Sequence, residues 1–260
     1  MPHPRGVFVF PARVGTKRLS SLTSNLANLP SGAPSLPRFC GKGGKGSDVA
    51  AFVLAGGRSS RMGSDKALVQ LAGRPMIAHA LAILRDAGLT AAIAGARSPL
   101  AQFAPIIEDE SPDSGPLAGI CAALASTAAQ HAVFLSVDQP LIPPSLIAYM
   151  THHAAVTGAA VMLASVNGIA QTFPAILDRT VLSSLRAALH ANRLGCFAAF
   201  QSAAGSLHRP LAVLPVELLA QCGAVGHSSA IPAAFWLSNI NTPADLARAD
   251  ALLAARDRVS

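Results

Sequence analysis

The stretch that decides the fold is residues 50–68, which read AAFVLAGGRSSRMGSDKAL. Its first five residues are apolar and suit a short buried strand, which the paired Gly56 and Gly57 would end. Glycines directly after a strand let backbone N–H groups approach an anion closely. Arg61 and Lys66 add positive charge in the same loop. The stretch therefore predicts a strand followed by a binding site for a triphosphate.

Lys66 is the only lysine in residues 48–260, where every other basic residue is arginine. A compact ammonium beside a glycine-rich turn suits a single-point contact with a phosphate. An ordinary solvated loop is the alternative interpretation.

Short apolar runs alternate with longer amphipathic stretches along the rest of the chain. We expect strands at 50–54, 91–94, 106–107, 132–137 and 159–164, and helices at 75–87, 116–129 and 143–153. Strands that alternate with helices of this length predict a parallel sheet covered on both faces. The expected fold is therefore α/β: a three-layer, Rossmann-like, mostly parallel sheet with helices on both faces, in a single domain.

Two acidic segments follow later strands of this pattern. Residues 108–119 contain four of the thirteen acids, and Asp138 directly follows the apolar run 132–137. Ligands of such sheets bind at the carboxyl ends of the strands. Because Mg2+ is usually held by one or two carboxylates plus substrate phosphates, Asp138 is a candidate metal ligand. The acids of 108–113 alone fit a solvated turn, a ribose or base contact, or a metal site.

Four segments together resemble one family. Residues 54–68 are similar to the signature L-A-G-G-x-S-x-R-M-G-x-D-K of nucleotidyltransferases with a glycosyltransferase-A-like fold. The other three resemble segments of the molybdenum cofactor guanylyltransferases. Glu108–Gly119 matches E-D-x-x-x-x-x-G-P-L-x-G, Asp138–Pro140 matches D-x-P, and Asn239–Leu246 matches N-x-N-T-P-x-[DE]-L. The resemblance covers almost all of residues 49–256.

The resemblance implies a set of functional residues. The nucleotide-binding positions that it implies are Leu54, Ala55, Gly56, Gly57, Lys66, Asp109 and Asp138. It also implies that Asp138 binds Mg2+ and that Arg61 and Lys66 are catalytic, because they balance charge that develops on the phosphates. One departure is Ala94, which stands where some members place a nucleotide-contacting asparagine.

The reaction implied by the resemblance transfers GMP from GTP to the phosphate of molybdenum-molybdopterin and releases pyrophosphate. A transient contact with molybdoenzymes or cofactor-insertion proteins is a further expectation. A sister group that adds CMP tends to carry L-A-A-G where this chain has L-A-G-G at 54–57, which favours guanine. Three alternatives stay open. The protein could be the molybdenum cofactor cytidylyltransferase of that sister group, a sugar- or terpenoid-phosphate nucleotidyltransferase, or a non-catalytic nucleotide-binding adaptor in cofactor delivery.

The last of the four segments also predicts the start of a helix. Thr242 suits the N-cap, Pro243 the first helical position and Asp245 the third. Capping does not account for Asn239 and Asn241. These asparagines either bridge strand ends near the second substrate or have no such role.

The net charge of +7 belongs to the amino-terminal segment. Residues 1–47 hold seven basic residues and no acid, whereas the remaining 13 basic residues balance all 13 acids. The body therefore needs no polyanionic partner, and no nucleic acid is expected. We expect residues 1–47 to form a disordered basic leader and 48–260 a nucleotidyltransferase domain. A targeting segment is the alternative for the leader.

The compartment is predicted from the cysteines and from the hydrophobic pattern. The four cysteines lie far apart, which fits neither a disulfide scaffold nor a zinc site; they are Cys40, Cys121, Cys196 and Cys222. No run of 18 uncharged apolar residues stands out, so no membrane partner is expected. Both observations favour a cytoplasmic protein.

Overall fold

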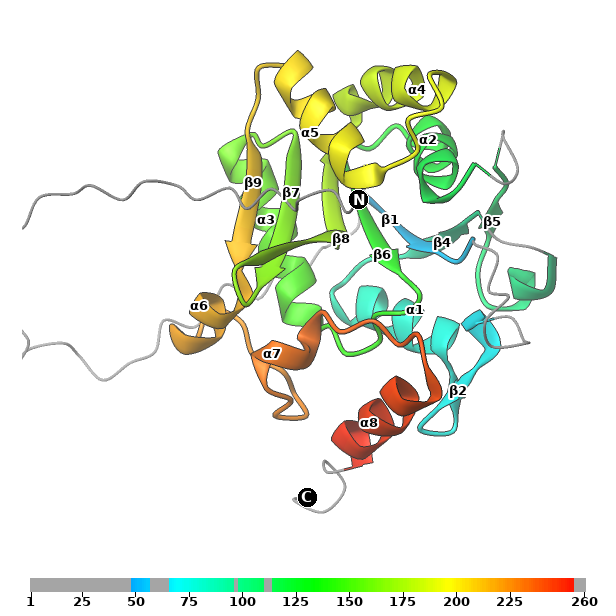
Figure 1. Cartoon of the computed structure of the whole chain (residues 1–260), viewed down its shortest axis with the longest axis vertical. Helices are drawn as coiled ribbons and strands as arrows, with labels where there is room; N and C mark the ends of the chain where they lie inside the picture. The colour runs from blue at the N-terminus through cyan, green and yellow to red at the C-terminus, as the bar shows by residue number, and fades with distance from the viewer. Residues whose placement is uncertain (1–47, 57–65, 96–97, 110–113, 255–260) are drawn as a thin grey trace, which may run out of the picture. The chain divides into compact units, whose positions relative to one another are not determined.

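The computed structural model describes residues 48–56, 66–95, 98–109 and 114–254, which belong to one compact unit, Gly43–Ser260. A seven-stranded sheet lies at its centre (Figure 1). Its strands are β1 (Val49–Leu54), β4 (Ala91–Ala94), β5 (Ile106–Ile107), β6 (His131–Ser136), β7 (Val161–Val166), β8 (Ile169–Asp178) and β9 (Leu211–Pro215). They are ordered β5-β4-β1-β6-β8-β7-β9.

The direction of the strands confirms a mostly parallel sheet. β1 pairs in parallel with β4 and β6, β4 with β5, and β7 with β9. Only β8 runs against its neighbours, since its pairings with β6 and β7 are both antiparallel. The chain adds β4 and β6 to opposite sides of β1, so the strand order reverses there. Ligands of open α/β sheets bind at the carboxyl ends of the strands beside such a reversal.

Helices cover both faces of the sheet, as predicted. They are α1 (Met76–Asp86), α2 (Pro116–Ser126), α3 (Pro144–Thr157), α4 (Leu182–His190), α5 (Cys196–Ser206), α6 (Val216–Gln221), α7 (Ala233–Trp236) and α8 (Pro243–Ala254). Ala51 and Val53 of β1 belong to one core, with α1, α3 and α6–α8. Phe52 and Leu54 belong to the other, with α2, α4 and α5. This alternation follows from the two-residue period of a strand.

The expected elements agree with the structure except at their ends. α2 stops at Ser126, and α3 continues to Thr157, where Gly158 ends it in the left-handed conformation that glycine favours. The sheet partners β8 and β9 were not predicted. The short elements are the hairpin β2 (Gln70–Leu71) and β3 (Arg74–Pro75), and the 3-10 helices η1 (Lys66–Leu68), η2 (Ser98–Gln102) and η3 (Arg179–Val181).

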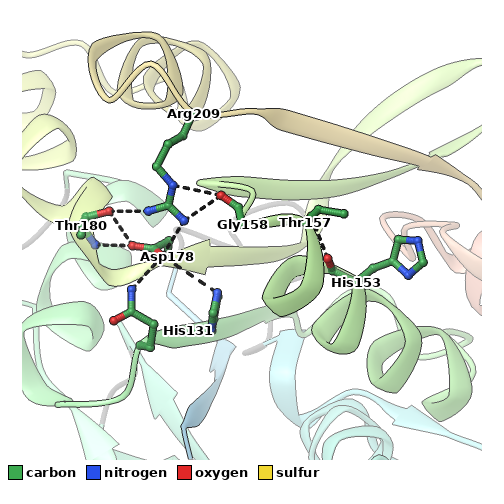
Figure 2. A network of polar contacts seen from close by, with 8 residues as sticks. His131, His153, Thr157, Gly158, Asp178, Thr180 and Arg209 are labelled. Carbon is green, nitrogen blue, oxygen red and sulfur yellow. Dashed lines mark hydrogen bonds and ion pairs between the residues drawn. The ribbon is translucent and has the colours of Figure 1, made fainter.

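An ion pair between the buried Asp178 and the partly exposed Arg209 stabilises the end of the sheet at which β6 begins (Figure 2). Asp178 closes β8 and is only 2% exposed. Its carboxylate accepts hydrogen bonds from Arg209 Nη2 at 2.8 Å, Gln130 Nε2 at 2.8 Å and the Thr180 N–H at 2.9 Å. Arg209 also donates to the carbonyl of Gly158, with Nε at 2.9 Å and Nη2 at 2.8 Å. The network therefore joins β8, the end of α3 and the chain entering β9.

Within the described ranges, no helix is long and apolar enough to cross a membrane. The thiols of Cys121 and Cys196 are buried, while Cys222 is exposed, and none of these three forms a disulfide. Burial and the neighbouring Cys121 raise the pKa of Cys196 to about 11, so its thiol stays protonated at neutral pH.

Candidate active site

Three side chains from distant parts of the chain meet at the carboxyl end of β6. Lys66 Nζ donates to Asp138 Oδ2 at 3.0 Å and to Asn241 Oδ1 at 2.6 Å. The side chains of Lys66 and Asp138 are 18% and 21% exposed, so solvent reaches the pair. The structure thus brings together the lysine and the carboxylate that the sequence selected, and it adds Asn241 to them.

Asp138 is held by the turn that follows β6. Ser136 Oγ donates to Asp138 Oδ1 at 2.5 Å, and the Gln139 N–H donates to the Ser136 carbonyl at 3.2 Å. The Val137 N–H donates to the Leu54 carbonyl at 3.1 Å, which joins this turn to the end of β1. Asp138 therefore lies at the carboxyl edge of the sheet, the position that its place in the sequence predicted.

Asn241 reaches Lys66 from residues 237–242, which we call the α7–α8 linker. Asp245 Oδ2 accepts from the N–H groups of Asn241 at 3.1 Å and Thr242 at 2.9 Å, and the Asp245 N–H donates to Thr242 Oγ1 at 3.2 Å. This is a capping box, so the predicted helix start is confirmed. Hydrogen bonds from Thr242 and Asn241 lower the pKa of Asp245. The Ile240 N–H donates to the Asp138 carbonyl at 2.9 Å, which docks the linker on the turn after β6.

Asp109, just after β5, packs against Gly95 after β4 and Gly119 of α2, and Gly95 in turn packs against Gly56 after β1. A Cβ at Gly56 would lie 2.5 Å from the Gly95 carbonyl oxygen. A Cβ at Gly95 would lie 3.2 Å from Asp109 Oδ2, and one at Gly119 would lie 3.1 Å from Asp109 Oδ1. The carboxylate therefore packs directly against backbone. The absence of side chains at Gly95 and Gly119 is what makes room for the carboxylate.

The carboxylate of Asp109 is not fully satisfied by the residues that the structure describes. Among them, none donates a hydrogen bond to Oδ1, although this atom is buried. Burial also raises the pKa of Asp109 above its ordinary value. A buried acceptor without a donor is costly in a folded protein. The Asp109 carboxylate therefore suits a ligand that has N–H donors.

The backbone positions implied for nucleotide binding lie at the end of β1. Leu54 is buried, Ala55 is half-buried and Gly56 is exposed, so the chain emerges from the core at these residues. The Ala55 N–H donates to the Ala94 carbonyl at 3.2 Å. The Ala94 side chain is buried in the core under α2. Two further predicted site residues, Gly57 and Arg61, lie outside the described residues.

Two features of the site were not predicted. Asn241 contacts Lys66 across 175 residues of sequence, a pairing that no local pattern signals. Asn239 lines a small hollow with Leu141 and Arg248. Gln139 lies between Asp138 and Pro140 and is almost completely buried. The D-x-P pattern does not specify which residue stands at this middle position.

The fold and the site define an α/β domain of the type that binds ligands at the carboxyl edge of its sheet, with a lysine and a carboxylate meeting where β6 ends. Residues 51–206 match the family model of the MobA-like NTP transferase domain, so the chain belongs to this family.

Curated relatives carry the name molybdenum cofactor guanylyltransferase. The Vibrio cholerae protein is 43% identical over 106 residues, which cover 39% of this chain and 52% of the relative. The Shewanella amazonensis protein is 33% identical over 148 residues, covering 55% of this chain and 76% of the relative. The chain spans about half the length of the first of these relatives.

Solved structures share the fold. Molybdopterin-guanine dinucleotide biosynthesis protein A from Archaeoglobus fulgidus aligns with a TM-score of 0.64 and 21% identity, over 79% of this chain and 98% of that one. The 2-C-methyl-D-erythritol 4-phosphate cytidylyltransferase of Thermus thermophilus aligns with a TM-score of 0.53 and 17% identity, over 77% and 96%. At these identities the likeness concerns the fold alone.

Proposed function

We propose that this protein transfers GMP from GTP to the phosphate of molybdenum-molybdopterin and releases pyrophosphate. The observation that carries the proposal is the contact of Lys66 with Asp138 and Asn241, which gathers a cation, a hard anionic ligand and a carboxamide where β6 ends. The names of the curated relatives supply the acceptor.

The proposed reaction needs no covalent intermediate on the protein. An oxygen of the acceptor phosphate attacks the α-phosphorus of GTP, the bond from that phosphorus to the oxygen leading to the β-phosphate breaks, and pyrophosphate leaves with the electron pair. Catalysis then consists of positioning and charge stabilisation. Lys66 supplies positive charge where negative charge collects on the leaving group, and we assign the same role to Arg61.

We propose Mg2+ as the metal, with Asp138 as its protein ligand. Within the described ranges, no three His, Cys, Asp or Glu side chains gather to hold a metal ion by themselves. A single carboxylate at the sheet edge fits Mg2+, which is commonly bound by one or two carboxylates together with substrate phosphates. When bound, the ion would neutralise charge on the phosphates. A structural neighbour from Mycobacterium tuberculosis was solved in complex with manganese, which supports a divalent metal in this fold.

Asp109 supports guanine as the base. Its Oδ1 is a buried acceptor without a donor among the described residues. Guanine offers adjacent N1–H and N2–H donors that one carboxylate can accept, whereas cytosine offers only its N4 amino group. The glycine pair in the L-A-G-G segment supports the same choice over the cytidylyltransferase alternative.

Calorimetric titration of GTP, CTP, ATP and UTP with Mg2+ present tests the base, and pyrophosphate release tests turnover. We expect GTP to bind at least tenfold more tightly than CTP, a gap of about 1.4 kcal/mol. Binding without pyrophosphate release in the presence of the acceptor would favour the nucleotide-binding adaptor. Preferential CTP binding would favour the cytidylyltransferase.

We also propose that residues 48–260 carry this activity without residues 1–47. The family match lies wholly inside the later segment. None of Cys121, Cys196 and Cys222 forms a disulfide, which agrees with a reducing compartment, and we propose the cytoplasm. Contacts with molybdoenzymes or cofactor-insertion proteins would be transient.

A further inference from the structure

Gln139 is a buried amide in the turn that carries Asp138. The residue is 2% exposed. Its Nε2 donates to the Phe173 carbonyl at 3.0 Å and to the Leu237 carbonyl at 3.3 Å. Because both partners can only accept hydrogen bonds, the amide nitrogen must face them. Both amide hydrogens of Gln139 are therefore used to hold backbone from two other segments.

The first of these segments lies where the pairing of β8 is irregular. Leu163 of β7 pairs with Ala175, but the next residue, Ala164, pairs with Gln171. Residues 172–174 consequently fall outside the regular ladder with β7. A backbone carbonyl in such a stretch needs another donor when it is buried. Gln139 supplies one.

The second segment is the α7–α8 linker, which begins at Leu237 and brings Asn241 to Lys66. Two hydrogen bonds join this linker to the turn after β6: Gln139 Nε2 to the Leu237 carbonyl, and the Ile240 N–H to the Asp138 carbonyl at 2.9 Å. Gln139 thus lies next to Asp138 in sequence and also donates a hydrogen bond to the linker that contains Asn241.

Packing alone does not explain an amide at this position. Oε1 of Gln139 is buried and has no donor among the described residues. An unpaired buried acceptor costs stability, a cost that the two hydrogen bonds donated by Nε2 must offset. The amide therefore acts by holding the two backbone segments to which Nε2 donates.

We infer that Gln139 is a positioning residue: it fixes the α7–α8 linker against the turn after β6, and so sets the relation of Asn241 to the Lys66–Asp138 pair. The inference rests on the proposed function for its consequence in catalysis. The docking itself is a property of the chain and can be measured without substrate.

Amide hydrogen exchange tests the docking. Gln139→Met keeps an unbranched side chain of similar length and removes both donors. We expect exchange at the Ile240 N–H to become about tenfold faster, as loss of a hydrogen bond implies. The Val137 N–H, which donates to the Leu54 carbonyl, serves as the reference for opening of the sheet. Unchanged Ile240 exchange relative to Val137 would overturn the inference.

A matched control is available at the other end of β6. Gln130 also donates its amide to a partner from a distant segment, Asp178 at 2.8 Å. Gln130→Met makes the same chemical change away from the site. We expect it to leave exchange at Ile240 unchanged. Equal acceleration by both variants would mean that Gln139 contributes only to general stability.

Kinetics test the consequence in the same two variants. For Gln139→Met we expect kcat to fall about tenfold and the Mg2+ concentration for half-maximal rate to rise at least threefold, since a positioning residue commonly accounts for changes of this order. Gln130→Met should change neither value in the folded fraction. A rate that falls only with the folded fraction, at unchanged Mg2+ dependence, would contradict the inference. If the wild-type protein transfers no GMP, the proposed function fails, and the exchange measurement still decides the docking.

A measurement on the wild-type chain covers the case in which Gln139→Met does not fold. The two side-chain amide protons of Gln139 should exchange with solvent at least tenfold more slowly than those of the exposed Gln102. Exchange at the rate of Gln102 would show that the contacts to the Phe173 and Leu237 carbonyls are not maintained in solution, and would overturn the inference.

Discussion

Lys66 Nζ lies 3.0 Å from Asp138 Oδ2, although 72 residues separate the two in the chain. Both side chains remain partly exposed at the carboxyl edge of the sheet. An ion pair at such a position contributes little to stability, with a typical value of about 0–1 kcal/mol. The pair is better explained by what a cation and a carboxylate can do together beside a polyphosphate. The two explanations predict different effects of substituting Lys66 and Asp138.

Lys66→Met should reduce transfer strongly and stability little. The substitution keeps the length of the side chain and removes its charge. Loss of a charge-assisted contact typically costs about 1.5–3 kcal/mol, or roughly tenfold to a hundredfold in rate. Arg74→Met, at an exposed residue of β3, is the control. The turnover rate and the melting temperature are measured for both variants. A normal rate with Lys66→Met would refute the role assigned to Lys66.

Asp138→Asn should lower the rate on the order of a hundredfold and raise the Mg2+ concentration needed for half-maximal rate, because a neutral amide is a poor ligand for this cation. Asp250→Asn is the matched control, since Asp250 accepts from the Ala72 N–H at 2.7 Å and lies outside the site. We would measure rates across a Mg2+ titration together with the melting temperature. Activity within about threefold of wild type and an unchanged titration would make Asp138 a turn residue, with Asp109 the next candidate ligand.

Asp109→Asn should stabilise the protein at neutral pH while weakening GTP binding. Burial raises the pKa of Asp109 above its ordinary value of 3.8. Stability from this group is therefore complete below pH 3.8 and is lost as the pH rises through the raised pKa. The variant avoids that loss, so its melting temperature should rise by roughly 1–4 °C at pH 7.

The gain from Asp109→Asn should disappear when melting is measured below pH 3.8. GTP affinity should fall about tenfold at pH 7, because hydrogen bonds to a charged acceptor are the stronger ones. Glu108→Gln, at the exposed neighbouring acid, should change neither quantity. An equal stability gain at both pH values would contradict the cause that we assign.

Arg209→Met should destabilise the fold without impairing catalysis in the folded fraction. Burial alone would raise the pKa of Asp178, but hydrogen bonds from Arg209, Thr180 and Gln130 outweigh it and lower the pKa. Because Arg209 is partly exposed, water can replace some of its contacts, and we expect the loss of this partner to cost about 1–3 kcal/mol. Urea unfolding of this variant and of Arg193→Met, at an exposed arginine, gives the comparison. A loss no larger than that of Arg193→Met would contradict the role of the network.

The strands and helices in the first half of the domain could be predicted from the sequence because the patterns that mark them are local. The strands at 91–94 and 106–107 begin and end where the pattern predicted, since apolar runs bounded by turn residues mark strands directly. The same logic placed Asp138 at the sheet edge. The reversed direction of β8 could not be predicted, because the alternation of side chains is the same in parallel and antiparallel strands.

The rest of the site depends on contacts that are distant in sequence. The capping box of α8 was predicted from Thr242 and Asp245, but capping does not say where the helix docks. The hydrogen bond from the Ile240 N–H to the Asp138 carbonyl does so, and it connects residues about a hundred positions apart. For the same reason, the contact of Asn241 with Lys66 could be seen only in the structure and not in its motif.

We propose above that this chain attaches GMP, taken from GTP, to the phosphate of molybdenum-molybdopterin. The direct measurement is mass spectrometry of the pterin product after incubation of the protein with this acceptor, Mg2+ and an equimolar mixture of GTP and CTP. We predict a product heavier than the acceptor by one GMP unit, with one pyrophosphate released for each product formed. A product that carries CMP, or an unchanged acceptor beside bound nucleotide, would contradict the claim.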